Sequence, residues 1–206
     1  MDYNNDNNDT DEVREPIVAY GKSKFTIEEY LEMERAGSWK HEYYQGEIFA
    51  MSGAANRHNI IFMNLYGDLA YRTKGKTCRP LGSDMRIYIP EKTFFTYPDI
   101  SIFCGEIKFM DDDNAIGPAA LIEILSPSTR NYDRGVKFGL YKAIPELKEY
   151  IMVDTKKMYV AAWRIDDQGQ WQLQEYDKPG DILQIATVAL SFSLADIYAD
   201  TRLLDT

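Results

Sequence analysis

Apolar and polar positions divide the chain into many short strand patterns and two longer helical patterns. The longest helical pattern covers residues 54–74, where Ile61, Leu65 and Leu69 recur at every fourth position. A second helix is predicted from about Asn131 to Ala143, because Pro145 ends it. Strand patterns cover residues 43–44, 47–51, 76–81, 84–89, 97–103, 119–125, 149–154, 158–164, 171–176 and 182–185. This order predicts an α/β or α+β fold with a mixed sheet flanked by helices.

Local motifs add detail to this pattern. Thr26 and Glu29 match a capping box, which predicts a helix that ends at Gly37, and the turn of a hairpin is predicted at residues 45–46. The alternation over residues 84–89 predicts a half-exposed strand with Arg86 on its polar side. The acidic stretch 110–117 is interpreted as an exposed loop, because it lacks the turn glycine and terminal glutamate of a calcium-binding loop.

One carboxylate interrupts the most apolar strand. Residues 119–125 are apolar except for Glu123, and an ionised carboxylate is costly to bury unless it is paired or binds a metal. A second carboxylate, Asp99, follows Pro98 at the head of another apolar strand. Lys137 lies on the predicted helix that follows Glu123, on one face with Asp133 and Tyr141. We therefore predict that Asp99, Glu123 and Lys137 converge on one hydrolytic centre.

Charge limits the partners that the chain can take. The formal net charge of the 206 residues is −10, and residues 1–15 account for −5 of it with six acidic residues and one Arg. We predict that residues 1–15 form a disordered acidic tail and that residues 16–206 form a single domain. A nucleic acid would need a local cationic patch or metal-neutralised carboxylates. Four basic residues beyond residue 71 are interpreted as a solvated helix end, with a phosphate-contacting patch as the alternative: Arg72, Lys74, Lys76 and Arg79.

Cys78 and Cys104 lack the spacing of a zinc site. We interpret them as two core thiols in a reducing compartment, although the sequence leaves a disulfide open. The N-terminus has no signal-peptide pattern, and no apolar run is long enough to span a bilayer. The expected location is therefore the cytoplasm, with no membrane partner.

The spacing of these residues resembles the PD-(D/E)XK nuclease superfamily. It is closer to the Uma-type family of bacterial putative restriction endonucleases. The resemblance spans about residues 25–194 and is carried by residues 45–47, His58, 97–99, 122–128, Asp133, Lys137, Tyr141, 149–150 and 153–154. It implies a restriction-endonuclease-like core with extra C-terminal strands and a nuclease site that uses Mg²⁺ or Mn²⁺ to hydrolyse DNA. It also implies that Asp99, Glu123 and the Ile124 carbonyl bind the metal. The pairing of sites in such nucleases, together with the extra strands, predicts a homodimer.

This sequence departs from the superfamily at its lysine. The superfamily lysine lies two residues after the acid, where this chain has Leu125, so its role would move to Lys137. Glu47 is a further catalytic candidate, and Glu42 is a weaker one. His58 is interpreted as a helix residue that forms hydrogen bonds, Asp133 as a residue that orients or caps the helix of Lys137, and Tyr141 as packing beneath the site. The alternative function is a catalytically inactive nuclease fold that binds nucleic acid or protein.

Overall fold

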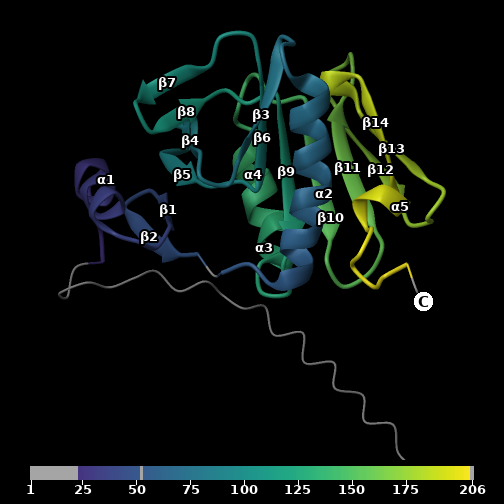
Figure 1. Cartoon of the computed structure of the whole chain (residues 1–206). Coiled ribbons are helices and arrows are strands. Elements are labelled where there is room, and N and C mark those ends of the chain that lie inside the picture. The colour runs from purple at the N-terminus through teal and green to yellow at the C-terminus, as the bar shows by residue number, and fades with distance from the viewer. Residues whose placement is uncertain (1–22, 52, 205–206) are drawn as a thin grey trace, which may run out of the picture.

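Two six-stranded sheets form the framework of the protein in a computed structural model that describes residues 23–51 and 53–204 (Figure 1). The predicted tail, residues 1–15, lies outside the described residues. The central sheet has the order β12 (Trp171–Tyr176), β11 (Val160–Ile165), β10 (Glu149–Asp154), β9 (Ala120–Leu125), β6 (Ile100–Cys104) and β3 (Cys78–Gly82). The second sheet has the order β2 (Glu47–Ala50), β1 (His41–Tyr44), β5 (Phe94–Thr96), β4 (Arg86–Ile89), β8 (Asn114–Ile116) and β7 (Lys108–Asp111). Both sheets are mixed, since β9 pairs in parallel with β10 and β4 with β8.

Helical segments cover both faces of the central sheet, which confirms the predicted mixed architecture. On one face, α2 (Asn56–Thr73) packs its fully buried Ile61, Leu65 and Leu69 against Ile122 and Ile124 of β9. Burying each such side chain stabilises the fold by about 1.5–3 kcal/mol. The hairpin of β13 (Ile182–Ile185) and β14 (Leu190–Ser193) and the short α5 (Leu194–Ile197) extend this layer.

The other face of the central sheet carries the second predicted helix. It consists of α3 (Arg130–Tyr132), a π-helical turn η2 (Asp133–Lys137) and α4 (Phe138–Tyr141), which run on without a break. This helix and the second sheet pack against the opposite side of β9, through Leu121 and Leu125. Alternation along β9 therefore sends Ile122 and Ile124 to α2, and Leu121, Glu123 and Leu125 to the π-turn helix.

The two local motifs at the start of the chain are confirmed. In α1 (Ile27–Ala36), the Glu29 amide donates to Thr26 Oγ1 at 3.2 Å and the Thr26 amide donates to Glu29 Oε2 at 2.8 Å. Gln45 and Gly46 form the turn between β1 and β2, both with positive φ, at 47° and 93°. A two-residue turn of this kind matches the twist of the strands that it joins.

Three segments differ from the predictions. Residues 110–117 are not an exposed loop, because most of them belong to β7 and β8, and Asp111 lies 3.1 Å from Arg35 of α1. Arg86 is buried rather than exposed, because its guanidinium donates to Asn114 and to Tyr97. The strand pattern missed β14, a four-residue strand whose partner is β13. For residues 110–117 and for Arg86 a partner comes from elsewhere in the chain, whereas β14 pairs with the neighbouring β13 in a local hairpin.

The interpretation of the cysteines as core thiols is wrong. Cys78 and Cys104 are joined in a disulfide. The reason is the register of β3 and β6, which places the two residues directly opposite each other across an antiparallel pair. No helix of the described residues is long and apolar enough to cross a membrane.

Candidate active site

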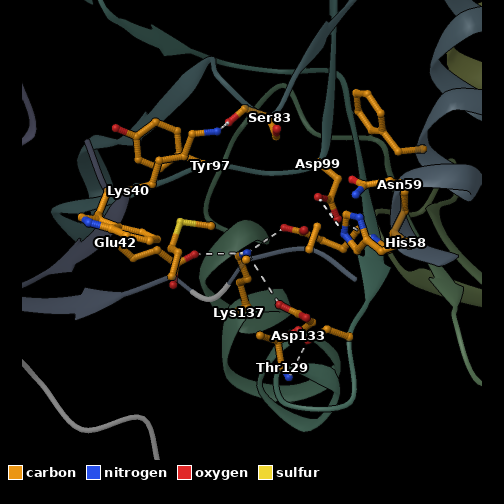
Figure 2. A pocket seen from close by; sticks show the side chains of 18 of the residues that line it. Lys40, Glu42, His58, Asn59, Ser83, Tyr97, Asp99, Thr129, Asp133 and Lys137 are labelled. Carbon is orange, nitrogen blue, oxygen red and sulfur yellow. Dashed lines mark hydrogen bonds and ion pairs between the residues drawn. The ribbon is translucent and has the colours of Figure 1, made fainter. Parts of the chain in front are cut away.

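Asp99, Glu123 and Lys137 line one cavity of about 390 Å³ between the central sheet, α2 and the π-turn helix (Figure 2). Glu42, His58 and Asp133 line the same cavity. Residues from β1, α2, the start of β6, β9 and η2 thus meet at one place, although they are up to 95 positions apart in the sequence.

Lys137 is the charge at the centre of the site. Its Nζ lies 2.8 Å from Glu123 Oε1, 3.1 Å from Glu42 Oε1 and 3.6 Å from Asp133 Oδ1. Only 5% of the lysine side chain is exposed, and no more than 6% of each of the three acidic side chains is exposed. A buried ammonium is tolerated only where such partners compensate its lost hydration.

The π turn brings Asp133 and Lys137 to this position. A π turn carries an extra residue compared with an α-helical turn and commonly occurs at functional sites. Here it spans Asp133–Lys137, and Tyr141 follows on the same face, where its hydroxyl donates to Glu123 Oε1 at 2.7 Å. Of the two roles predicted for Asp133, capping is wrong, because the residue lies within the helix, and the orienting role stays a prediction, with the carboxylate facing Lys137. Tyr141 packs beneath the site, as expected, and also holds Glu123.

Asp99 is held by backbone that the sheet leaves unpaired. The ladder between β6 and β9 ends at the pair Ile100 and Ile122. The free amide of Ile124 donates instead to Asp99 Oδ2 at 2.7 Å. The other oxygen, Oδ1, lies 3.1 Å from His58 Nε2. His58 therefore pairs with Asp99 across the cavity, and its Nδ1 is buried without a hydrogen-bond partner in the described residues.

The charges in the cavity shift one another's protonation. Burial, together with the negative charges of Asp133 and Asp99, raises the pKa of Glu123 to about 8 against the attraction of Lys137. Burial alone would lower the pKa of Lys137, but Glu123 and Glu42 outweigh it and raise that pKa well above its usual value. Burial also lowers the pKa of His58, yet the hydrogen bond and charge of Asp99 raise it overall. Among the described residues, the cavity is thus lined by four carboxyl groups, of Glu42, Asp99, Glu123 and Asp133, and by three basic groups, of Lys40, His58 and Lys137.

Comparison with known proteins identifies the family. Residues 27–196 match the model of the Uma2 family, described as putative restriction endonuclease. The chain belongs to the Uma2 family. Two Synechocystis proteins are similar to it, both named as uncharacterized: slr1290, 34% identical over 85% of this chain and 92% of that protein, and sll1609, 34% identical over 73% and 86%. The crystal structure of a putative nuclease belonging to DUF820 from Anabaena variabilis superposes with a TM-score of 0.69 and 20% identity, over 85% of this chain and 98% of that chain. It shares the restriction-endonuclease-like fold that the sequence predicts.

The donor set of this Uma2 site fits a hard divalent cation. The Tyr141 hydroxyl and the Lys137 ammonium both contact Oε1 of the Glu123 carboxylate. Within the described part of the chain, Oε2 is therefore available to bind a metal. Mg²⁺ typically takes one or two protein carboxylates and keeps several waters, so Asp99 and Glu123 in a cavity of this size suffice. In the described residues, no three His, Cys, Asp or Glu side chains form a complete metal cage. The Ile124 carbonyl as a further ligand stays a prediction.

Glu47 does not have the position expected of a catalytic residue. Its carboxylate lies 2.9 Å from Lys24 Nζ at the hairpin turn and does not line the cavity. Glu42, five residues earlier on β1, points into the cavity and accepts from Thr96 Oγ1 at 2.6 Å and from Tyr132 at 3.1 Å. Both glutamates belong to one hairpin, but β1 pairs with β5 inside the second sheet, whereas β2 forms its edge.

The raised pKa of Glu123 predicts a stability that declines with pH. A carboxyl whose pKa is higher in the folded state than its usual 4.3 stabilises the fold at low pH, and this contribution is lost as the pH rises through about 8. Glu123→Gln removes this dependence. We expect the free energy of unfolding of the wild type to fall relative to Glu123→Gln between pH 5 and pH 9, by up to about 1.4 kcal/mol per pH unit. Urea denaturation at pH 5 and pH 9 measures the free energies of unfolding, with Glu47→Gln as the control. If the difference between the wild type and Glu123→Gln is the same at both pH values, the raised pKa of Glu123 is wrong.

Proposed function

We propose that this Uma2 protein is an endonuclease that uses Mg²⁺, or Mn²⁺ in its place, to hydrolyse phosphodiester bonds in DNA. The observation that carries the proposal is the meeting of Asp99, Glu123 and Lys137 in one cavity with a surplus of carboxylates. Membership of a family described as putative restriction endonuclease supports the nucleic-acid substrate.

Each residue has a physical role in this proposal. Asp99 and Glu123 would hold the cation, which when bound would polarise a phosphoryl oxygen and lower the pKa of a bound water. Tyr141 and Lys137 fix the Glu123 carboxylate from one side, and the Ile124 amide and His58 fix Asp99 from the other. Lys137 also supplies the positive charge that would face the developing charge on the phosphate. The long side chain of Lys137 reaches Glu123 of β9 from the helix. In this proposal Lys137 takes the role of the lysine that the wider superfamily carries on the strand.

Cleavage of a supercoiled plasmid tests the proposal. We expect nicked and linear products with Mg²⁺ or Mn²⁺ and none with EDTA, because two carboxylates and an ammonium cannot activate water without the cation. Linear oligonucleotides, single-stranded and double-stranded, then distinguish internal cleavage from trimming of ends. Intact DNA of every kind with both metals would contradict the proposal and would favour the inactive binding module.

The homodimer is part of the same proposal. Strand β12 forms one edge of the central sheet, and its Leu173 is 44% exposed. An exposed apolar side chain on an edge strand favours pairing with a second copy. Light scattering of the purified protein measures the mass, and a monomer at micromolar concentration would refute this part.

A further inference from the structure

Five basic side chains gather around the loop that follows β10. Arg130 and Arg134, from the π-turn helix, lie 2.6 Å and 3.7 Å from the two carboxylate oxygens of Asp154. Arg57, at the start of α2, donates to the Thr155 carbonyl at 2.9 Å. Lys156 and Lys157 follow in the loop itself. We call this set, Arg57, Arg130, Arg134, Lys156 and Lys157, the basic surface.

The basic surface carries more positive charge than its neighbours neutralise. Asp154 is fully buried, and its Oδ1 also accepts the amides of Lys156 and Lys157, at 2.7 and 3.3 Å. This carboxylate therefore fixes the loop and pairs with two arginines at once. Glu175 accepts a hydrogen bond from the Tyr159 hydroxyl. The cationic groups of Arg134 and Lys157 lie over the ring of the same tyrosine. Within the described residues, Asp154 is thus the one carboxylate that forms ion pairs with these five cations, in a chain whose formal net charge is −10.

The basic surface borders the candidate active site. Arg57 precedes His58, Arg130 follows Thr129 and Arg134 follows Asp133, and the second residue of each pair lines the cavity. Figure 1 shows the start of α2, α3 and the loop between β10 and β11 at the same end of the molecule. The side chains of Arg134, Lys156 and Lys157 are exposed there.

We propose that the basic surface binds the phosphates of a nucleic-acid backbone next to the cavity. The identity of the ligand rests on the proposed function. Lys and Arg are the side chains that most often position a protein on phosphates. The rest of the chain is acidic and repels a polyanion, so that attraction has to be local. Attachment at this surface would bring the neighbouring phosphodiester to the cavity that Asp99 and Glu123 line.

A matched pair of triple variants tests the proposal. The first is Arg134→Gln, Lys156→Gln and Lys157→Gln, which removes three exposed charges of the basic surface. The control is Arg79→Gln, Lys74→Gln and Lys76→Gln, which removes the same residue types, also exposed, beyond the other end of α2. The 18 residues of α2 separate the two clusters by roughly 27 Å. Fluorescence anisotropy with a short labelled DNA duplex in EDTA measures binding without cleavage, at several salt concentrations, and thermal melting checks folding.

Each phosphate contact adds about 0.9 to the slope of log affinity against log salt. We expect the first variant to bind more weakly and to lose about three units of slope, whereas the control keeps the slope of the wild type. Equal effects in the two variants, an unchanged slope in the first, or a wild type that does not bind DNA would overturn the proposal. If the first variant loses the expected slope but the wild type does not cleave DNA in Mg²⁺, the proposed function is wrong and this inference holds. If the wild type cleaves DNA but the first variant keeps the wild-type slope, the proposed function holds and this inference is wrong.

Discussion

Replacing Glu123 by Gln is expected to reduce DNA cleavage about a thousandfold. Gln keeps the shape of the side chain and one oxygen, but it removes the negative charge that would hold the divalent cation. A catalytic metal supplies several kcal/mol of transition-state stabilisation, and each 1.4 kcal/mol corresponds to a factor of ten in rate. Initial rates of plasmid nicking over a range of Mg²⁺ concentrations measure the loss. Asp99→Asn is expected to have an effect of the same order, because Asp99 lines the same cavity.

Glu47→Gln is the matched control for this experiment. It makes the same chemical change at a residue that pairs with Lys24 outside the cavity, so its rate should stay within about twofold of the wild type. The comparison also decides between the two acids that the sequence offers. A large loss in Glu47→Gln with little change in Glu123→Gln would overturn the assignment of the site.

Replacing Lys137 by Met is expected to destabilise the protein by ~3–5 kcal/mol at neutral pH. Met keeps most of the volume but leaves Glu42, Glu123 and Asp133 without their shared cation, and breaking a buried ion pair by removing one partner costs this much. Denaturation in urea measures the change. Cleavage should also be lost, because the only lysine that lines the cavity among the described residues is then Lys40, which pairs with Asp84 at 2.6 Å.

Lys142→Met is the control for stability. Lys142 is exposed, and its ammonium lies 4.3 Å from the centre of the Phe138 ring, so its replacement should change the free energy of unfolding by about 1 kcal/mol or less. The double variant Lys137→Met with Glu123→Gln should recover part of the loss, because one of the uncompensated carboxylates is removed with the lysine. Equal stability of Lys137→Met and Lys142→Met would show that the ammonium is not the shared counter-charge.

The elements of the fold were accessible from the sequence because they rest on local pattern. Periodicity over residues 54–74 predicts α2, and the apolar run with one carboxylate predicts β9. Thr26 and Glu29 place the start of α1 by hydrogen bonds within four residues. Local pattern also predicts that Asp99, Glu123 and Lys137 share one site, because a buried carboxylate requires a partner and Lys137 follows Glu123 on the next helix.

What the sequence determined by itself was therefore the elements, their buried faces and the demand of Glu123 for a partner. Only the tertiary structure decided that Glu42 rather than Glu47 completes the site, since this follows from the pairing of β1 with β5, about 50 residues away. It also decided the disulfide of Cys78 and Cys104, through the register of β3 and β6. The tertiary structure likewise decided the π turn that directs Lys137 into the cavity. It also brought the basic surface together from three segments that are distant in the sequence. Local periodicity reports which side of an element is buried, whereas the partner that it meets depends on strand register and helix packing between residues far apart in the chain.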